Sequence, residues 1–164
     1  MRNLIFVDTE TTGFDDDPDA QMWELSWAPR EGAVRTLWFG FKEIPAEIDE
    51  LTGFTKRNCA GKRSDYFEFE EFLRASKDAT MVAANPAFDE HFIKLAGLWQ
   101  FHYRKLDIES YAMAKLNLDE VPSMIGIYRE LEPHIGGLIM PDHSSRNDVL
   151  AMRECYLFLE QMTS

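Results

Sequence analysis

Hydrophobic and polar positions follow two rhythms along the chain: short apolar runs dominate its N-terminal quarter, and helical spacing dominates much of the rest. The apolar runs predict the first three strands at residues 4–7, 21–28 and 34–41. Helices are predicted at residues 46–51, 65–77, 88–98, 119–132 and 146–162, with apolar residues at helical spacing in 88–98 and 146–162 and a stop at Gly53 after the first. Two more short apolar runs predict strands at residues 80–84 and 103–108.

The expected order of elements is β-β-β-α-α-β-α-β-α-α-α, in which one of the last three helices has no range of its own. An antiparallel three-strand meander followed by βαβ units predicts an α/β fold, a mixed sheet with added parallel strands and flanking helices. The 164 residues contain no internal repeat, low-complexity tract or linker. A single domain, 1–164, is therefore expected.

The chain is acidic, with 29 acidic against 17 basic residues and a net charge of −12. This balance argues against a protein that coats nucleic acid through many phosphate contacts. It leaves open a small cleft in which bound divalent cations reverse the local field. No apolar run is long enough for a membrane span or a signal peptide, so no membrane association and a cytoplasmic location are expected. Cys59 and Cys155 lack metal-type spacing and are expected to be reduced packing residues.

Asp8 and Glu10 follow the first apolar run. Residues i and i+2 of a strand share one face, so both carboxylates should project together. Two such anions favour a shared cation, and Mg²⁺ and Mn²⁺ prefer carboxylate oxygens. An ordinary acidic strand end is the alternative interpretation.

Asp89 stands near the start of the helix that follows the fourth strand, where ligands of open α/β sheets gather. It could equally complement the helix dipole. His143 precedes Asp148 by five residues, which suits a loop histidine beside a helix-borne acid. A neutral imidazole can act as a base for water near neutral pH. The alternative is a surface histidine with a helix-capping acid.

Together these segments resemble the histidine subclass of the DEDD 3′→5′ exonucleases. Phe6–Gly13 (FVDTETTG) resembles the first motif, Asn85–Asp89 (NPAFD) the second, and His143 with Asp148 the third. Weaker matches lie at residues 23–25, 51–55 and 105–107. All the matches follow the order of the family and extend from residue 4 to about 152. The sequence departs from the family at Ala84, Pro86 and Ser145, none of which is an expected metal ligand.

The resemblance implies a ribonuclease H-like fold and two-metal hydrolysis that releases nucleoside 5′-monophosphates. The implied ligands of the two divalent cations, Mg²⁺ or Mn²⁺, are Asp8, Glu10, Asp89 and Asp148. His143 would accept a proton from the attacking water. Thr9, Thr11 and Phe88 would lie beside the terminal nucleotide. Glu24 could contact the terminal sugar, but an acid in a second strand is more often at the surface, so it is left out of the expected site.

The expected partner is nucleic acid, either DNA or RNA, offered as single-stranded 3′ ends or short oligonucleotides. Association with a polymerase is compatible with the resemblance, but no segment after the last expected helix indicates it. One alternative is a phosphatase of the haloacid-dehalogenase type, which also has an acid pair after an apolar strand. That chemistry normally needs Asp at the second position, where this chain has Glu10, and leaves His143 without a role. Another alternative is a non-catalytic binding module on the same fold.

Overall fold

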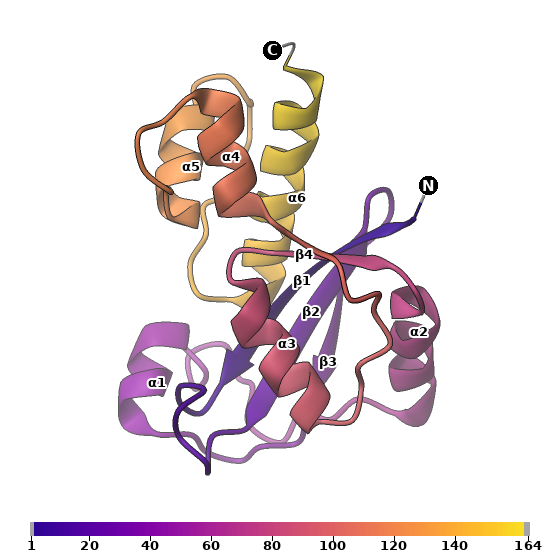
Figure 1. The fold of residues 1–164 in the computed structure, drawn as a ribbon. Helices are drawn as coiled ribbons and strands as arrows, with labels where there is room; N and C mark the ends of the chain where they lie inside the picture. Colours follow the sequence, from indigo (N-terminus) through magenta and orange to yellow (C-terminus); the bar gives the residue numbers. More distant parts are fainter. Residues whose placement is uncertain (1, 163–164) are drawn as a thin grey trace.

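A computed structural model describes residues 2–162 (Figure 1). They include a five-stranded sheet in the order β3-β2-β1-β4-β5. The strands are β1 (Leu4–Thr11), β2 (Met22–Pro29), β3 (Arg35–Trp38), β4 (Thr80–Ala83) and β5 (Lys105–Asp107). Strand β1 is central: it pairs antiparallel with β2 and parallel with β4. The predicted α/β fold with a mixed sheet is confirmed.

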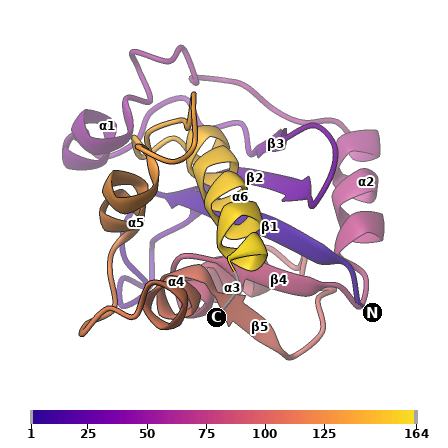
Figure 2. The ribbon, with the colours of Figure 1, turned by 90° about the horizontal axis from the view of Figure 1, so that it is seen from above.

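Helices cover both faces of this sheet. They are α1 (Ala46–Thr52), α2 (Tyr66–Ser76), α3 (Pro86–Leu95), α4 (Ile108–Leu116), α5 (Met124–Leu131) and α6 (Ser145–Gln161). Helix α6 lies across β1 and β2, with α4 and α5 beside it (Figure 2). Helices α2 and α3 contribute to a separate core cluster on the opposite face. The sheet is thus buried between two helical layers.

The sequence of β1 explains why it occupies the centre. Ile5 and Val7 pack into the layer of α2 and α3, whereas Phe6 packs into the layer of α6. A strand with apolar side chains on both faces is typical of a position buried on both sides. The alternation continues past Val7, so polar residues at the end of β1 are also distributed between the two layers.

Several boundaries differ from the expected ones for local reasons. Strand β3 ends at Trp38, because Gly40 adopts a left-handed conformation and its N–H bonds the carbonyl of Lys62. Helix α5 begins only after Pro122, where the Ser123 hydroxyl accepts the N–H of Gly126. The expected helix at 119–132 was therefore too long at its start.

The prediction for the two cysteines agrees with the structure, in which Cys59 and Cys155 are buried and unbridged. Among residues 2–162, no helix is long and apolar enough to cross a membrane.

Candidate active site

Three carboxylates converge at the carboxyl end of β1. Asp8 and Glu10 lie on the strand face that meets α6, and Asp148 comes from the first turn of that helix. One carboxylate oxygen of each residue lies within 4.8 Å of the others. Oxygens at this spacing can ligate a divalent cation jointly, since Mg²⁺ and Mn²⁺ favour carboxylate ligands.

The N-terminus of α6 is fixed against the sheet by a chain of hydroxyl groups. Ser145 is fully buried, and its hydroxyl donates to Ser26 Oγ at 2.7 Å. Ser26 is the cross-strand partner of Asp8 and shares a 2.8 Å hydrogen bond with Thr36. This contact explains how a serine fits at position 145. It also sets the position of Asp148, one turn further along α6.

Asp89 reaches the cluster from the opposite layer. It lies in the first turn of α3 and is only 3% exposed. The Thr9 hydroxyl, which points away from Asp8 and Glu10 along β1, donates to Asp89 Oδ1 at 2.9 Å. After burial, the charge of Asp89 is the largest contribution that raises the pKa of Asp8. Asp8, Glu10 and Asp148 thus converge, and Asp89 is a charged neighbour of Asp8 from the other layer.

Burial raises the pKa of every one of these four carboxyl groups, and repulsion from neighbouring carboxylates adds to it at Asp8 and Glu10. Burial raises the pKa of Asp89 to about 7 and that of Asp148 to about 6. The pKa values of Asp8 and Glu10 are raised well above their ordinary values, first by burial and then by neighbouring carboxylates. Such a cluster takes up protons or cations to relieve the repulsion. Its donor set therefore fits divalent metal.

His143 lies beside this cluster but is exposed. It adopts a left-handed conformation, φ 57°, in the loop before α6. The loop is held by the backbone N–H of Asp142, which donates to Asp148 Oδ1 at 2.9 Å. The charge of His143 lowers the pKa of Asp148, against the larger raising effect of burial. The structure thus places the histidine next to the expected metal ligand of α6.

The other expected residues flank the acids. The Thr11 hydroxyl donates to the carbonyl of Gly13 at 2.6 Å, which shapes the turn after β1. Phe88 is half-buried one position before Asp89, and its ring packs on Phe92 with centroids 4.9 Å apart.

Glu24 was wrongly expected at the surface. It is 0% exposed and lies directly across the ladder from Glu10. Arg57, in the loop after α1, donates to both of its carboxylate oxygens at 2.6 and 2.7 Å. Two features of the sequence point to this burial. The apolar residues Trp23 and Leu25 flank Glu24, and the strand is the middle one of the meander, which is covered on both faces.

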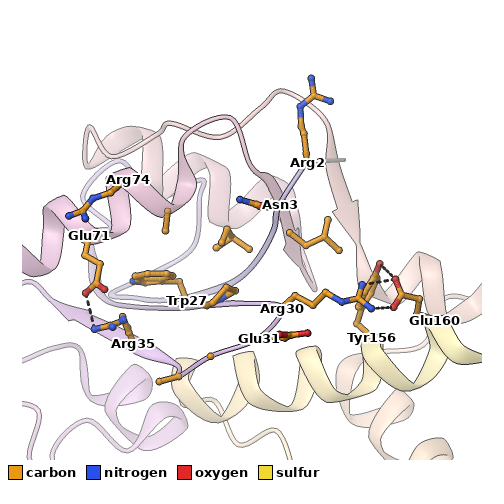
Figure 3. A pocket seen from close by; sticks show the side chains of 16 residues that line it. Arg2, Asn3, Trp27, Arg30, Glu31, Arg35, Glu71, Arg74, Tyr156 and Glu160 are labelled. Atoms are coloured by element: carbon orange, nitrogen blue, oxygen red, sulfur yellow. Dashed lines mark hydrogen bonds and ion pairs between the residues drawn. The ribbon is translucent and has the colours of Figure 1, made fainter.

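A cavity of about 820 Å³ lies at the other end of the sheet, around the start of β1 and the end of β2. Trp27 forms part of its wall, with an Arg35–Glu71 ion pair on one side and an Arg30–Glu160 ion pair on the other (Figure 3). None of the converging carboxylates lines it. The chemistry of the chain is therefore concentrated in the carboxylate cluster rather than in this cavity.

Known proteins share this fold. No family model matches the chain. Over 142 residues it is 30% identical to the PolC-type DNA polymerase III of Thermotoga maritima, a match that covers 76% of this chain and 10% of that protein. The chain thus spans about a tenth of the length of the curated relatives it matches.

Two solved structures extend the likeness to the whole fold. Cell-death related nuclease 4 (CRN-4) has a TM-score of 0.68 at 13% identity, covering 99% of this chain and 64% of that chain. The zinc-bound complex of Escherichia coli exonuclease I with single-stranded DNA has a TM-score of 0.63 at 14% identity, covering 95% of this chain and 40% of that chain. The resemblance inferred from the motifs is confirmed: the chain has the fold of CRN-4 and exonuclease I, and most of its sequence is similar to part of a PolC-type polymerase.

Proposed function

We propose that the chain is a metal-dependent 3′→5′ exonuclease that shortens single-stranded DNA or RNA and releases nucleoside 5′-monophosphates. The observation that carries this proposal is the convergence of Asp8, Glu10 and Asp148, with Asp89 behind them, on a fold shared with known nucleases. A complete carboxylate set with an adjacent histidine favours an enzyme over a non-catalytic binding module. Glu10 at the second position gives no support to haloacid-dehalogenase chemistry.

Asp8, Glu10, Asp89 and Asp148 would hold two divalent cations, Mg²⁺ or Mn²⁺. When bound, the ions would supply positive charge that stabilises the attacking and leaving oxygens of a phosphodiester. The hydroxyl of Thr9, which donates to Asp89 Oδ1, would fix the orientation of the Asp89 carboxylate.

The remaining site residues would activate the attacking water and contact the substrate. His143, exposed beside Asp148, would accept the proton of the attacking water, as a neutral imidazole can near neutral pH. The Phe88 ring would stack on the terminal base, whichever base it is, and the backbone around Thr9 and Thr11 would contact the same nucleotide.

The net charge of the chain favours contact with only a few nucleotides of the substrate. Affinity for a long strand requires many phosphate contacts by Lys and Arg, and the net charge of −12 argues against them. We therefore propose single-stranded 3′ ends or short oligonucleotides as substrates. We further propose that residues 1–164 act as one domain in the cytoplasm. No polymerase partner is proposed.

The test is degradation of end-labelled DNA and RNA oligonucleotides with added Mg²⁺ or Mn²⁺. We expect products shortened from the 3′ end, protection by a blocked 3′ terminus, and none by a blocked 5′ terminus. The Asp8→Asn variant, which keeps the shape of the side chain, should be inactive. Release of inorganic phosphate, cleavage of closed circular strands, or full activity with a chelator present would contradict the proposal.

A further inference from the structure

We propose that the Glu24–Arg57 ion pair sets the net charge of the metal site. In this arrangement Glu24 is a fifth carboxylate beside the four proposed ligands, and Arg57 both cancels its charge and keeps it from binding metal. This inference rests on the proposed function, because it assigns a role to residues outside the proposed ligand set.

Glu24 belongs to the same electrostatic unit as the ligands. It is fully buried and faces Glu10 directly across the β1–β2 ladder. After burial, the charge of Glu24 is the largest contribution that raises the pKa of Glu10, ahead of that of Asp148. An uncompensated charge at Glu24 would therefore act on the cluster almost as a further ligand does.

Arg57 is held in place on several sides. One of its guanidinium nitrogens donates to both oxygens of Glu24, at 2.6 and 2.7 Å. The guanidinium lies over the rings of Trp23 and Trp38, at 5.7 and 5.9 Å from their centroids. Cation–π contacts of this kind favour a fixed, partly desolvated guanidinium. Because both oxygens of Glu24 accept from Arg57, turning them toward a metal ion would break these hydrogen bonds.

The charges explain why the pair matters. Four ligand carboxylates would balance two divalent cations, so a substrate phosphate would meet a site close to neutral. An ionised Glu24 without Arg57 would leave the site negative and repel phosphate, whereas Arg57 without Glu24 would leave it positive and weaken cation binding. The pair keeps the site close to neutral, because each partner cancels the charge of the other.

This role makes the two single variants change metal affinity in opposite directions. Glu24→Gln removes a negative charge, so Mn²⁺ should bind roughly 10-fold more weakly. Arg57→Gln removes a positive charge, so Mn²⁺ should bind roughly 10-fold more tightly. The double variant should return close to the wild-type affinity, and Arg57→Lys, which keeps the charge, should also stay close to it.

The measurement is calorimetric titration of each protein with Mn²⁺ in the absence of nucleic acid, with a thermal melt to confirm folding. Arg35→Gln and Glu71→Gln are matched controls, because this pair is also an Arg–Glu ion pair, 2.8 Å apart, but lines the distant cavity. Equal shifts in the controls, or shifts of the same sign in Glu24→Gln and Arg57→Gln, overturn the inference alone. If Arg57→Gln does not fold, the other two single variants still test the inference. Unchanged Mn²⁺ affinity in Glu24→Gln, or a large change of Mn²⁺ affinity in Arg57→Lys, contradicts the inference. A wild-type protein that binds no Mn²⁺ would instead refute the proposed function, and this inference with it.

Discussion

His143 differs from the four clustered carboxylates in being an exposed residue in a loop. Its loop is anchored through the backbone of Asp142 rather than through the imidazole. A side chain placed in this way contributes little to packing but can meet a water molecule at the cluster. We therefore expect His143 to affect the rate of the reaction and not the stability of the fold.

Replacing His143 by Ala should accordingly lower the rate of hydrolysis by ~10²–10⁴, the usual contribution of a positioned acid–base group, and leave the melting temperature unchanged. Single-turnover assays at neutral pH with saturating Mg²⁺ measure this. The control is His134→Ala, which removes another exposed histidine, one that stacks on Phe158. A rate near that of the wild type would assign proton transfer to another group.

The residues of the site differ in how far the sequence could reveal them. Asp8, Glu10, Asp89 and Asp148 lie in segments with motif spacing. The structure brings three of them within 4.8 Å of one another, and the charge of Asp89 acts on Asp8. Glu24 could not be placed in the same way, because its importance comes from its partner across the ladder and from Arg57, 33 residues later. Sequence spacing within one strand carries no information about either contact.

The packing of the N-terminus of α6 against the sheet determines how close Asp148 comes to β1. Ser145 packs against the sheet without exposed surface, so a larger side chain there must push the helix outward. Ser145→Val should cost about 1–3 kcal/mol in the free energy of unfolding, the usual effect of overpacking, and should also weaken metal binding.

Ser145→Ala is the matched control for that variant. It should cost about 1–2 kcal/mol, because it removes the contacts of the hydroxyl with Ser26 and Glu24 without adding volume, while Ser26 keeps its bond to Thr36. Chemical denaturation and Mn²⁺ titration of both variants provide the test. Equal metal affinity in Ser145→Val and Ser145→Ala would show that the packing of the α6 N-terminus does not position Asp148.

The elements themselves were predicted best where a periodic pattern coincided with a local signal. The expected helix at 65–77 corresponds to α2, whose start is fixed by reciprocal hydrogen bonds between Asp65 and Glu68. Helix α4 had no expected range, because its apolar residues lie around the whole helix and form no stripe. Only its packing against β5, α5 and α6 makes it a recognisable part of the fold.

At the scale of the whole molecule, the carboxylate cluster links stability to pH. The folded pKa values of Asp89, about 7, and Asp148, about 6, lie above the ordinary value of 3.8. Protonation of these groups thus stabilises the metal-free fold. Their contribution is complete below about pH 4 and is lost as the pH rises through about 6 and about 7.

The melting temperature of the metal-free protein should therefore fall between about pH 4 and about pH 7, and fall less in the Asp89→Asn, Asp148→Asn double variant. Saturating Mn²⁺ should raise the wild-type melting temperature most at the upper end of this range, because the metal binds the ionised carboxylates. Thermal melts with and without Mn²⁺ across the range check both effects. Identical pH profiles for wild type and double variant would contradict the assigned pKa shifts.

The two-sided character of β1 also restricts how this chain can change over evolutionary time. Successive residues of the strand alternate between the two helical layers, so Asp8 and Glu10 meet α6 while Thr9 meets Asp89 of α3. Gain or loss of one residue before Asp8 would exchange these sides and put core side chains where the carboxylates belong. The exposed segment at residues 14–19 carries no such constraint. Descendants of this sequence can therefore vary in length in that loop, whereas β1 can diverge only by substitution.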